Sequence, residues 1–180
     1  MLEITIPDKE FYDEKNEVFI PKKGATIRLE HSLVSISKWE AKWKVPFISK
    51  TEKTREQIID YIKFMTLTQN VDPDVYMILT QENINDISSY IEDPMTASWV
   101  NDLDDKKHSN EQVTSELIYW WMTQLRIPWE AQKWHLNRLL MLIRIGNIKS
   151  QPPKKMSKAA ILARNKRLNE ERRRKYNSKG

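Results

Sequence analysis

Histidine and carboxylate side chains are the first candidates for catalysis or metal binding, because the chain contains no cysteine. None of the three histidines (His31, His108 and His135) belongs to a His-Glu-x-x-His pattern or to a pair with metal-ligand spacing. A group of acidic residues lies within the polar stretch 100–109, and the simplest interpretation is that these charges are solvated. Three glycines are too few for a Gly-rich phosphate loop. We therefore expect no enzyme, cofactor or metal site.

The strongest candidate for binding is the C-terminal tail. Residues 149–180 contain 12 Lys and Arg and 2 acids, a net charge of +10, whereas residues 1–148 contain 18 bases and 23 acids, a net charge of −5. Such a tail could neutralise phosphates, contact an acidic protein surface, or remain a solvated, disordered end. Stacking on single-stranded nucleic acid is not supported, because Tyr176 is the one aromatic residue of the tail.

A second candidate is the motif Trp134-His-Leu-Asn-Arg138, which places three polar residues in an apolar segment. Buried polar groups must be hydrogen-bonded. These side chains either tie their helix to a neighbouring backbone or form a polar interface to a partner. The nearby tryptophans, among them Trp120 and Trp129, are expected to be core residues for the most part.

Two helices are predicted to position this motif. Val113, Leu117, Trp121 and Leu125 recur at i+4 spacing, as on one apolar helix face. A second helix is predicted from Pro128, at its first position, to about Ile145. We expect the two to form a hairpin that supplies most of the core, and a capping box of Ser109 and Gln112 to begin it.

Other elements precede this hairpin. Alternating apolar residues at 2–6 and 25–30, with a turn within 11–20, predict a sheet of two or three strands; the alternative is an irregular arm. Helices are predicted from Ser32 to Pro46 and after the capping box Thr54–Gln57. Asp72-Pro73 and Thr80 should begin two more.

The chain is therefore predicted to be mainly α, with a small N-terminal β element over 1–30, a helical domain over 31–148 centred on the hairpin of about 110–148, and a Pro linker with a basic helix over 149–180. Its length is sufficient for one domain with a core. No apolar run approaches the roughly 20 residues of a membrane span, and no signal peptide is recognisable, so an intracellular protein is expected.

The chain also resembles a family of tailed-phage proteins. The likeness covers nearly the whole chain and rests on the segments Leu29-Glu-His-Ser-Leu-Val-Ser-Ile-Ser-Lys-Trp-Glu40, Met65-Thr-Leu-Thr-Gln-Asn-Val-Asp-Pro73 and Trp134-His-Leu-Asn-Arg-Leu-Leu140, and on an ending with Met156-Ser, Ala163-Arg-Asn, Leu168-Asn and Arg172-Arg. The family is the tail assembly chaperones of long-tailed phages (siphoviruses). Its motifs carry no known chemistry, so no catalytic residue is implied.

The resemblance implies a mostly helical, non-catalytic protein that binds the tape measure protein, keeps it soluble during tail assembly, and is absent from the mature virion. Its implied location is the host bacterial cytoplasm. Further candidate partners are the tail tube protein and a second copy of the chain. The resemblance also implies that this chain is the shorter of two forms related by a ribosomal frameshift. The alternatives are a structural tail or head-tail component and a nucleic-acid-binding protein acting through its tail.

The candidate partner-binding residues combine the motif, the tryptophans and the basic tail. They are Trp120, Trp129, Trp134, His135, Arg138, Lys154, Lys155, Arg164, Arg167, Arg172, Arg173 and Arg174.

Overall fold

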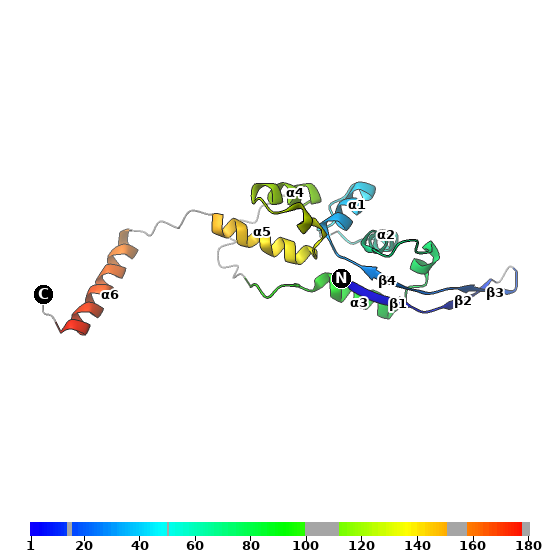
Figure 1. Cartoon of the computed structure of the whole chain (residues 1–180), viewed down its shortest axis with the longest axis horizontal. Helices are drawn as coiled ribbons and strands as arrows, with labels where there is room; N and C mark the ends of the chain where they lie inside the picture. The colour runs from blue at the N-terminus through cyan, green and yellow to red at the C-terminus, as the bar shows by residue number, and fades with distance from the viewer. Residues whose placement is uncertain (14–15, 50, 100–111, 151–157, 178–180) are drawn as a thin grey trace. The chain divides into compact units, whose positions relative to one another are not determined.

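Helices predominate in the structure, and a small β region precedes them, as the sequence predicts (Figure 1). The structure is a computed structural model that describes residues 1–13, 16–49, 51–99, 112–150 and 158–177. The chain divides into two compact units, residues 1–148 and residues 149–180.

The N-terminal strands form two antiparallel ladders along one hairpin. β1 (Leu2–Ile6) pairs with β4 (Ala25–Leu29), and β2 (Lys9–Asp13) pairs with β3 (Val18–Lys22). The chain therefore has four strands here, and the prediction of two or three is wrong. Both predicted strands and the turn between them are nevertheless present, and β2 and β3 continue the hairpin beyond β1 and β4 (Figure 1).

A close backbone approach separates the two ladders. The N–H of Gly24 donates to the Asp8 carboxylate over 2.7 Å. A Cβ atom at Gly24 would lie 1.9 Å from the carbonyl oxygen of Ile6, so no other residue fits here without moving the backbone. Pro7 has no N–H to donate to a ladder. The hairpin must therefore break between β1 and β2, which the sequence pattern alone did not reveal.

The helices of the first unit follow in chain order. They are α1 (Leu33–Trp43), α2 (Arg55–Met65), the 3-10 helix η1 (Pro73–Met77), α3 (Gln81–Glu92), α4 (Ser115–Gln124), the 3-10 helix η2 (Trp129–Lys133) and α5 (Leu136–Ser150). Four of the predicted helix starts in this unit are confirmed. Ser32 caps α1, and Thr54 and Gln57 form the capping box of α2. Asp72 caps η1 with Pro73 at its first position, and Thr80 caps α3.

The largest share of the core comes from the β1–β4 ladder and the first two helices. These four elements contribute ten of the 21 buried apolar residues in the described part of the chain: Ile4, Ile6, Ile27, Leu29, Leu33, Ile36, Trp39, Tyr61, Ile62 and Met65. α4 and α5 add Ile118, Met122, Leu136, Leu139 and Ile143. The prediction that their hairpin supplies most of the core is therefore wrong. The large side chain of Trp120 on α4 stays outside the core instead.

α4 begins later than predicted, and with a different cap. Thr114 is the N-cap residue, and its hydroxyl accepts from the N–H of Leu117. Gln112 lies exposed ahead of the helix, and Ser109 lies outside the described residues, so the capping box proposed for this pair is not the one that begins the helix. The buried Glu40 of α1 accepts from the N–H groups of Phe47 (2.7 Å) and Ser115 (2.8 Å). This carboxylate fixes where α4 starts, through a contact that the local sequence does not contain.

α5 also begins later than predicted. Pro128 precedes a 3-10 turn in which the N–H of Trp134 donates to Ala131, so the segment 129–134 is not α-helical. The backbone of Trp134 is extended, and the N–H of Leu136 donates to the carbonyl oxygen of His31 over 2.8 Å. This hydrogen bond to a residue distant in sequence prevents the backbone before Leu136 from being helical. The predicted helix from Pro128 is therefore two elements.

The second unit contains the basic helix α6 (Lys158–Tyr176), at the predicted place. Its described side chains are exposed except for the half-buried Leu168. Arg167 and Glu171, one turn apart, form an exposed ion pair at 3.6 Å. In the described parts of both units, no helix combines the length and apolar character needed to cross a membrane.

Candidate partner-binding surfaces

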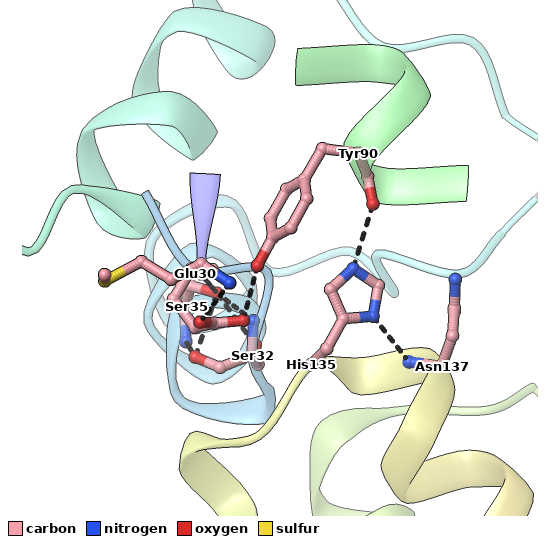
Figure 2. Close-up of polar contacts among 7 residues, drawn as sticks. Glu30, Ser32, Ser35, Tyr90, His135 and Asn137 are labelled. Atoms are coloured by element: carbon pink, nitrogen blue, oxygen red, sulfur yellow. Dashed lines mark hydrogen bonds and ion pairs between the residues drawn. The ribbon is translucent and has the colours of Figure 1, made fainter. Parts of the chain in front are cut away.

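His135 lies in the core, just before α5, and is only 6% exposed. Its Nε2 is 2.9 Å from the carbonyl oxygen of Tyr90, and its Nδ1 accepts from the N–H of Asn137 at 3.3 Å (Figure 2). A carbonyl can only accept, so Nε2 carries the proton and the ring is the neutral tautomer with a bare Nδ1. The ring thus caps α5 while binding α3. The predicted partner-binding residue His135 is therefore buried in the core.

Asn137 extends the same link between α5 and α3. Its side-chain amide donates to the carbonyl oxygens of Ile91 (2.9 Å) and Asp93 (2.8 Å). These carbonyls lie at the C-terminal end of α3, where a helix has no internal donors left for them. Of the two interpretations of the motif, His135 and Asn137 therefore follow the first, in which polar side chains tie a helix to a neighbouring backbone.

The buried polar cluster also includes His31. Its ring packs edge-on against His135, with 5.0 Å between centroids, and its Nδ1 is 2.5 Å from the Tyr61 hydroxyl. Burial, and to a lesser extent the His135 ring, lowers the pKa of His31 to about 3, and burial raises the pKa of Tyr61. The hydroxyl of Tyr90 donates to Glu30 at 2.6 Å, and burial raises the pKa of Tyr90 as well (Figure 2).

This arrangement keeps the His31 imidazole and the phenols of Tyr61 and Tyr90 uncharged. A neutral imidazole and two protonated phenols, all hydrogen-bonded, favour a stable core over proton transfer. Among the described residues, no cluster of three or more potential metal ligands occurs. The hydrogen bonds of the cluster therefore join the elements of the core.

Trp134 and Arg138 lie on the outside of the same motif. The Arg138 guanidinium lies over the Trp134 ring, 4.6 Å from its centroid, and the tryptophan is 37% exposed. A cation stacked on an exposed indole is a typical partner contact, because both groups combine area with directional bonding. The structure thus separates the motif into the buried His135, the half-buried Asn137 and an exposed stacked pair.

Two further candidate tryptophans are exposed as well, not core residues. Trp120 is 55% exposed on α4, and Trp129 is 57% exposed at the start of η2. The Trp129 ring packs on Tyr119, with 5.5 Å between centroids, and the Tyr119 hydroxyl donates to Gln132. The expectation that most tryptophans of this region are core residues is therefore wrong for Trp120, Trp129 and Trp134.

A surface groove runs along α2. It consists of two adjoining hollows of about 430 and 580 Å³ that share Arg55, Ile59 and Met77. We call it the α2 groove. It is lined by Lys42, Trp43, Arg55, Glu56, Ile58, Ile59, Asp60, Ile62, Lys63, Tyr76, Met77, Leu79, Gln81 and Ile84. None of the predicted site residues lies in it.

The two parts of the α2 groove differ in polarity. The part toward α3 is mainly apolar, and Ile58 (43%) and Met77 (59%) expose large side chains there. The part toward α1 has a charged rim, where Asp60 pairs with both Lys42 and Lys63. Such a groove can receive the apolar side chains of a helix and hold polar groups at its border.

The basic candidates fall into the second unit. Arg164, Arg167, Arg172, Arg173 and Arg174 are exposed on α6, and Lys154 and Lys155 lie outside the described residues. Helix α6 carries eight Lys or Arg and two Glu. It therefore presents a net charge of +6 on one helix.

The sequence contained no clear signal for the groove. Ile58 shares an apolar face of α2 with the buried Ile62 and Met65, but it lies in the first turn of the helix and is 43% exposed. Periodicity predicts neither this exposure nor that of Met77, because both depend on how neighbouring elements pack.

No family model matches this chain, and no curated protein or solved structure is significantly similar to it.

Proposed function

We propose that this protein is a tail assembly chaperone of a long-tailed phage, which binds helical segments of the tape measure protein in the host cytoplasm and is absent from the finished virion. The proposal begins from the resemblance of the sequence motifs. The observation that carries it further is the α2 groove, an apolar surface hollow bordered by charged side chains.

The chemistry of the groove suits an amphipathic helix. Helix-binding proteins receive side chains at i, i+3, i+4 and i+7 in an apolar groove, and the polar residues of the helix stay at the border. Met77 offers a flexible, polarisable surface that adapts to different apolar side chains along a long partner. A chaperone must bind many similar segments of one long helical chain, so such an adaptable surface is useful.

Exposed aromatic residues offer a second contact region in the same unit. Trp120, Trp129 and the stacked pair Trp134–Arg138 have the composition of protein-binding hot spots, in which tryptophan and arginine are enriched. They support protein binding in general and do not distinguish the tape measure protein from the tail tube protein.

Co-expression with the tape measure protein of the same phage tests the proposal. The wild-type chain should raise the soluble fraction of the tape measure protein several-fold and co-purify with it. Ile58→Asp and Met77→Asp should lose most of this effect, because a carboxylate in the apolar part of the groove must be desolvated when a helix docks. Soluble fraction and pull-down yield are the measurements.

Leu67→Asp is the matched control, since Leu67 is 54% exposed and does not line the groove. It should behave as wild type. The proposal fails if the wild-type chain neither binds nor solubilises the tape measure protein. If all three variants bind equally well, binding occurs elsewhere and the groove is not the site.

A structural role in the virion is the main alternative within the phage interpretation. Mass spectrometry of purified virions separates the two, because a chaperone should be missing from particles and a tail or head-tail component should be abundant. A second candidate function, nucleic-acid binding through α6, is favoured by its net charge of +6.

A further inference from the structure

The β2–β3 hairpin exposes large apolar side chains that the first unit does not cover. Its exposed apolar residues are Phe11 (40%), Tyr12 (52%), Val18 (54%), Phe19 (63%) and Ile20 (42%). A two-stranded hairpin is marginally stable alone in water, and exposed apolar strands tend to pair with other chains. The ion pair of Lys22 with Asp74 in η1 holds the base of the hairpin. A partner for the remainder is therefore needed.

Apolar groups occupy both faces of this hairpin. Strand alternation and the observed register place Phe11, Val18 and Ile20 on one face. Tyr12 and Phe19 share the other face, where their ring centroids are 5.0 Å apart. A surface that covers one face would leave the other in water. A strand added at the edge, in contrast, extends both faces of the sheet at once.

The two edges of the hairpin are not equivalent. Pro21 has no N–H, so it belongs at a position whose backbone points away from the neighbouring strand. In the observed register Pro21 faces Glu10, and Phe19 faces Tyr12. The free edge of β3 is therefore interrupted at Pro21, whereas β2 directs the intact N–H and C=O groups of Glu10 and Tyr12 outward. The β2 edge is the one suited to strand pairing.

We propose that β2 pairs with β2 of a second copy of this chain, antiparallel and centred on Phe11, to form a four-stranded sheet in the order β3-β2-β2-β3. This register is the one that pairs all five residues of β2. Glu10 then exchanges backbone hydrogen bonds with Tyr12 of the other copy, as their outward backbone groups require. Phe11 faces Phe11 across the two-fold axis.

Charge supports the same register. A shift by two residues in one direction would set Glu10 opposite Glu10, which places like charges together. A shift in the other direction would set Tyr12 opposite Tyr12 and carry Glu10 past the end of the strand. The self-complementary strand therefore selects a second copy as the partner, independently of the proposed function.

Two proline variants test which edge is used. Tyr12→Pro and Phe19→Pro each remove one ring of the same aromatic pair and one outward N–H, but on opposite edges. Sedimentation velocity should show a dimer for the wild-type chain, at least tenfold weaker association for Tyr12→Pro, and unchanged association for Phe19→Pro. A monomeric wild-type chain at tens of micromolar overturns the proposal. Equal losses in both variants, or a loss in Phe19→Pro alone, also overturn it.

Single cysteines test the register, because the chain has no cysteine of its own. Residues facing each other in a non-hydrogen-bonded pair have Cα atoms about 4.5 Å apart, within the range of a disulfide. Phe11→Cys should therefore form a covalent dimer under mild oxidation, as seen on non-reducing gels. Glu10→Cys should not, since two copies of residue 10 are diagonal to each other. The opposite result would overturn the proposed register.

Discussion

His31 and His135 lie in contact in the core, and both rings accept hydrogen bonds or donate them to fixed partners. Their role is therefore tied to the stability of the fold. Neither ring lies in the α2 groove or on the β2 edge. At the scale of single residues, these two histidines, which the sequence offers as candidates for catalysis or metal binding, join elements of the fold.

His31 should make the folded state sensitive to acid. Burial, followed by the His135 ring, lowers its pKa to about 3, while the unfolded chain should titrate near 6.5. Between these values the unfolded state binds a proton that the folded state does not. The free energy of unfolding should therefore fall as pH falls through this window, by at most about 1.4 kcal/mol per pH unit, with no contribution above about pH 6.5.

Urea denaturation at pH 7 and pH 5 measures this effect. In His31→Asn the side-chain oxygen can still accept from Tyr61, but the group no longer titrates. The variant should lose less stability than the wild type on going from pH 7 to pH 5. If both chains lose the same amount, another group causes the acid sensitivity.

At the scale of elements, the link between α5 and α3 depends on Asn137. Its amide satisfies two terminal carbonyls of α3, at Ile91 and Asp93. Asn137→Ala should lower the free energy of unfolding by about 1–3 kcal/mol, because the donors disappear while part of this contact stays out of water. Asn147→Ala, an exposed position on the same helix, should change it by less than about 0.5 kcal/mol. Chemical denaturation of both variants is the measurement, and equal effects would contradict the assignment.

The sequence correctly predicted the helix starts that depend on residues close by in the chain. The caps at Thr54, Asp72 and Thr80 lie within a few residues of the groups they bind, so a sequence pattern is sufficient to find them. The start of α4 depends on Glu40, and the start of α5 depends on the carbonyl of His31. Both bonds join residues far apart in sequence, which explains why the two predicted helix starts are wrong.

Sequence periodicity gave less information about the surfaces. It correctly predicts apolar faces on α2 and α4, but it does not tell which apolar residues the neighbouring elements leave uncovered. Ile58, in the first turn of α2, and Trp120 on α4 are exposed examples. The β2–β3 hairpin is a similar case, since alternation predicts strands but not that both of their faces lack a covering layer.

At the scale of the whole molecule, the two units differ in charge and in burial. The first carries a net charge of −5 and contains the core, the α2 groove and the β2 edge. The second carries +10, and the described side chains of α6 are almost all exposed. A helix of 19 residues that buries little apolar area gains little stability from packing. The second unit should therefore act mainly through its positive charge.

Removing residues 151–180 separates the two candidate functions. The truncated chain keeps all of α5, so its melting temperature should stay within about 2 °C of the full chain, which calorimetry can measure. If the groove binds the tape measure protein, the truncated chain should still co-purify with it. Duplex DNA provides the contrast, because binding through α6 should disappear on truncation and weaken steeply with salt in the full chain. Loss of tape measure binding on truncation, with salt-dependent DNA binding by the full chain, would favour the nucleic-acid function over the chaperone.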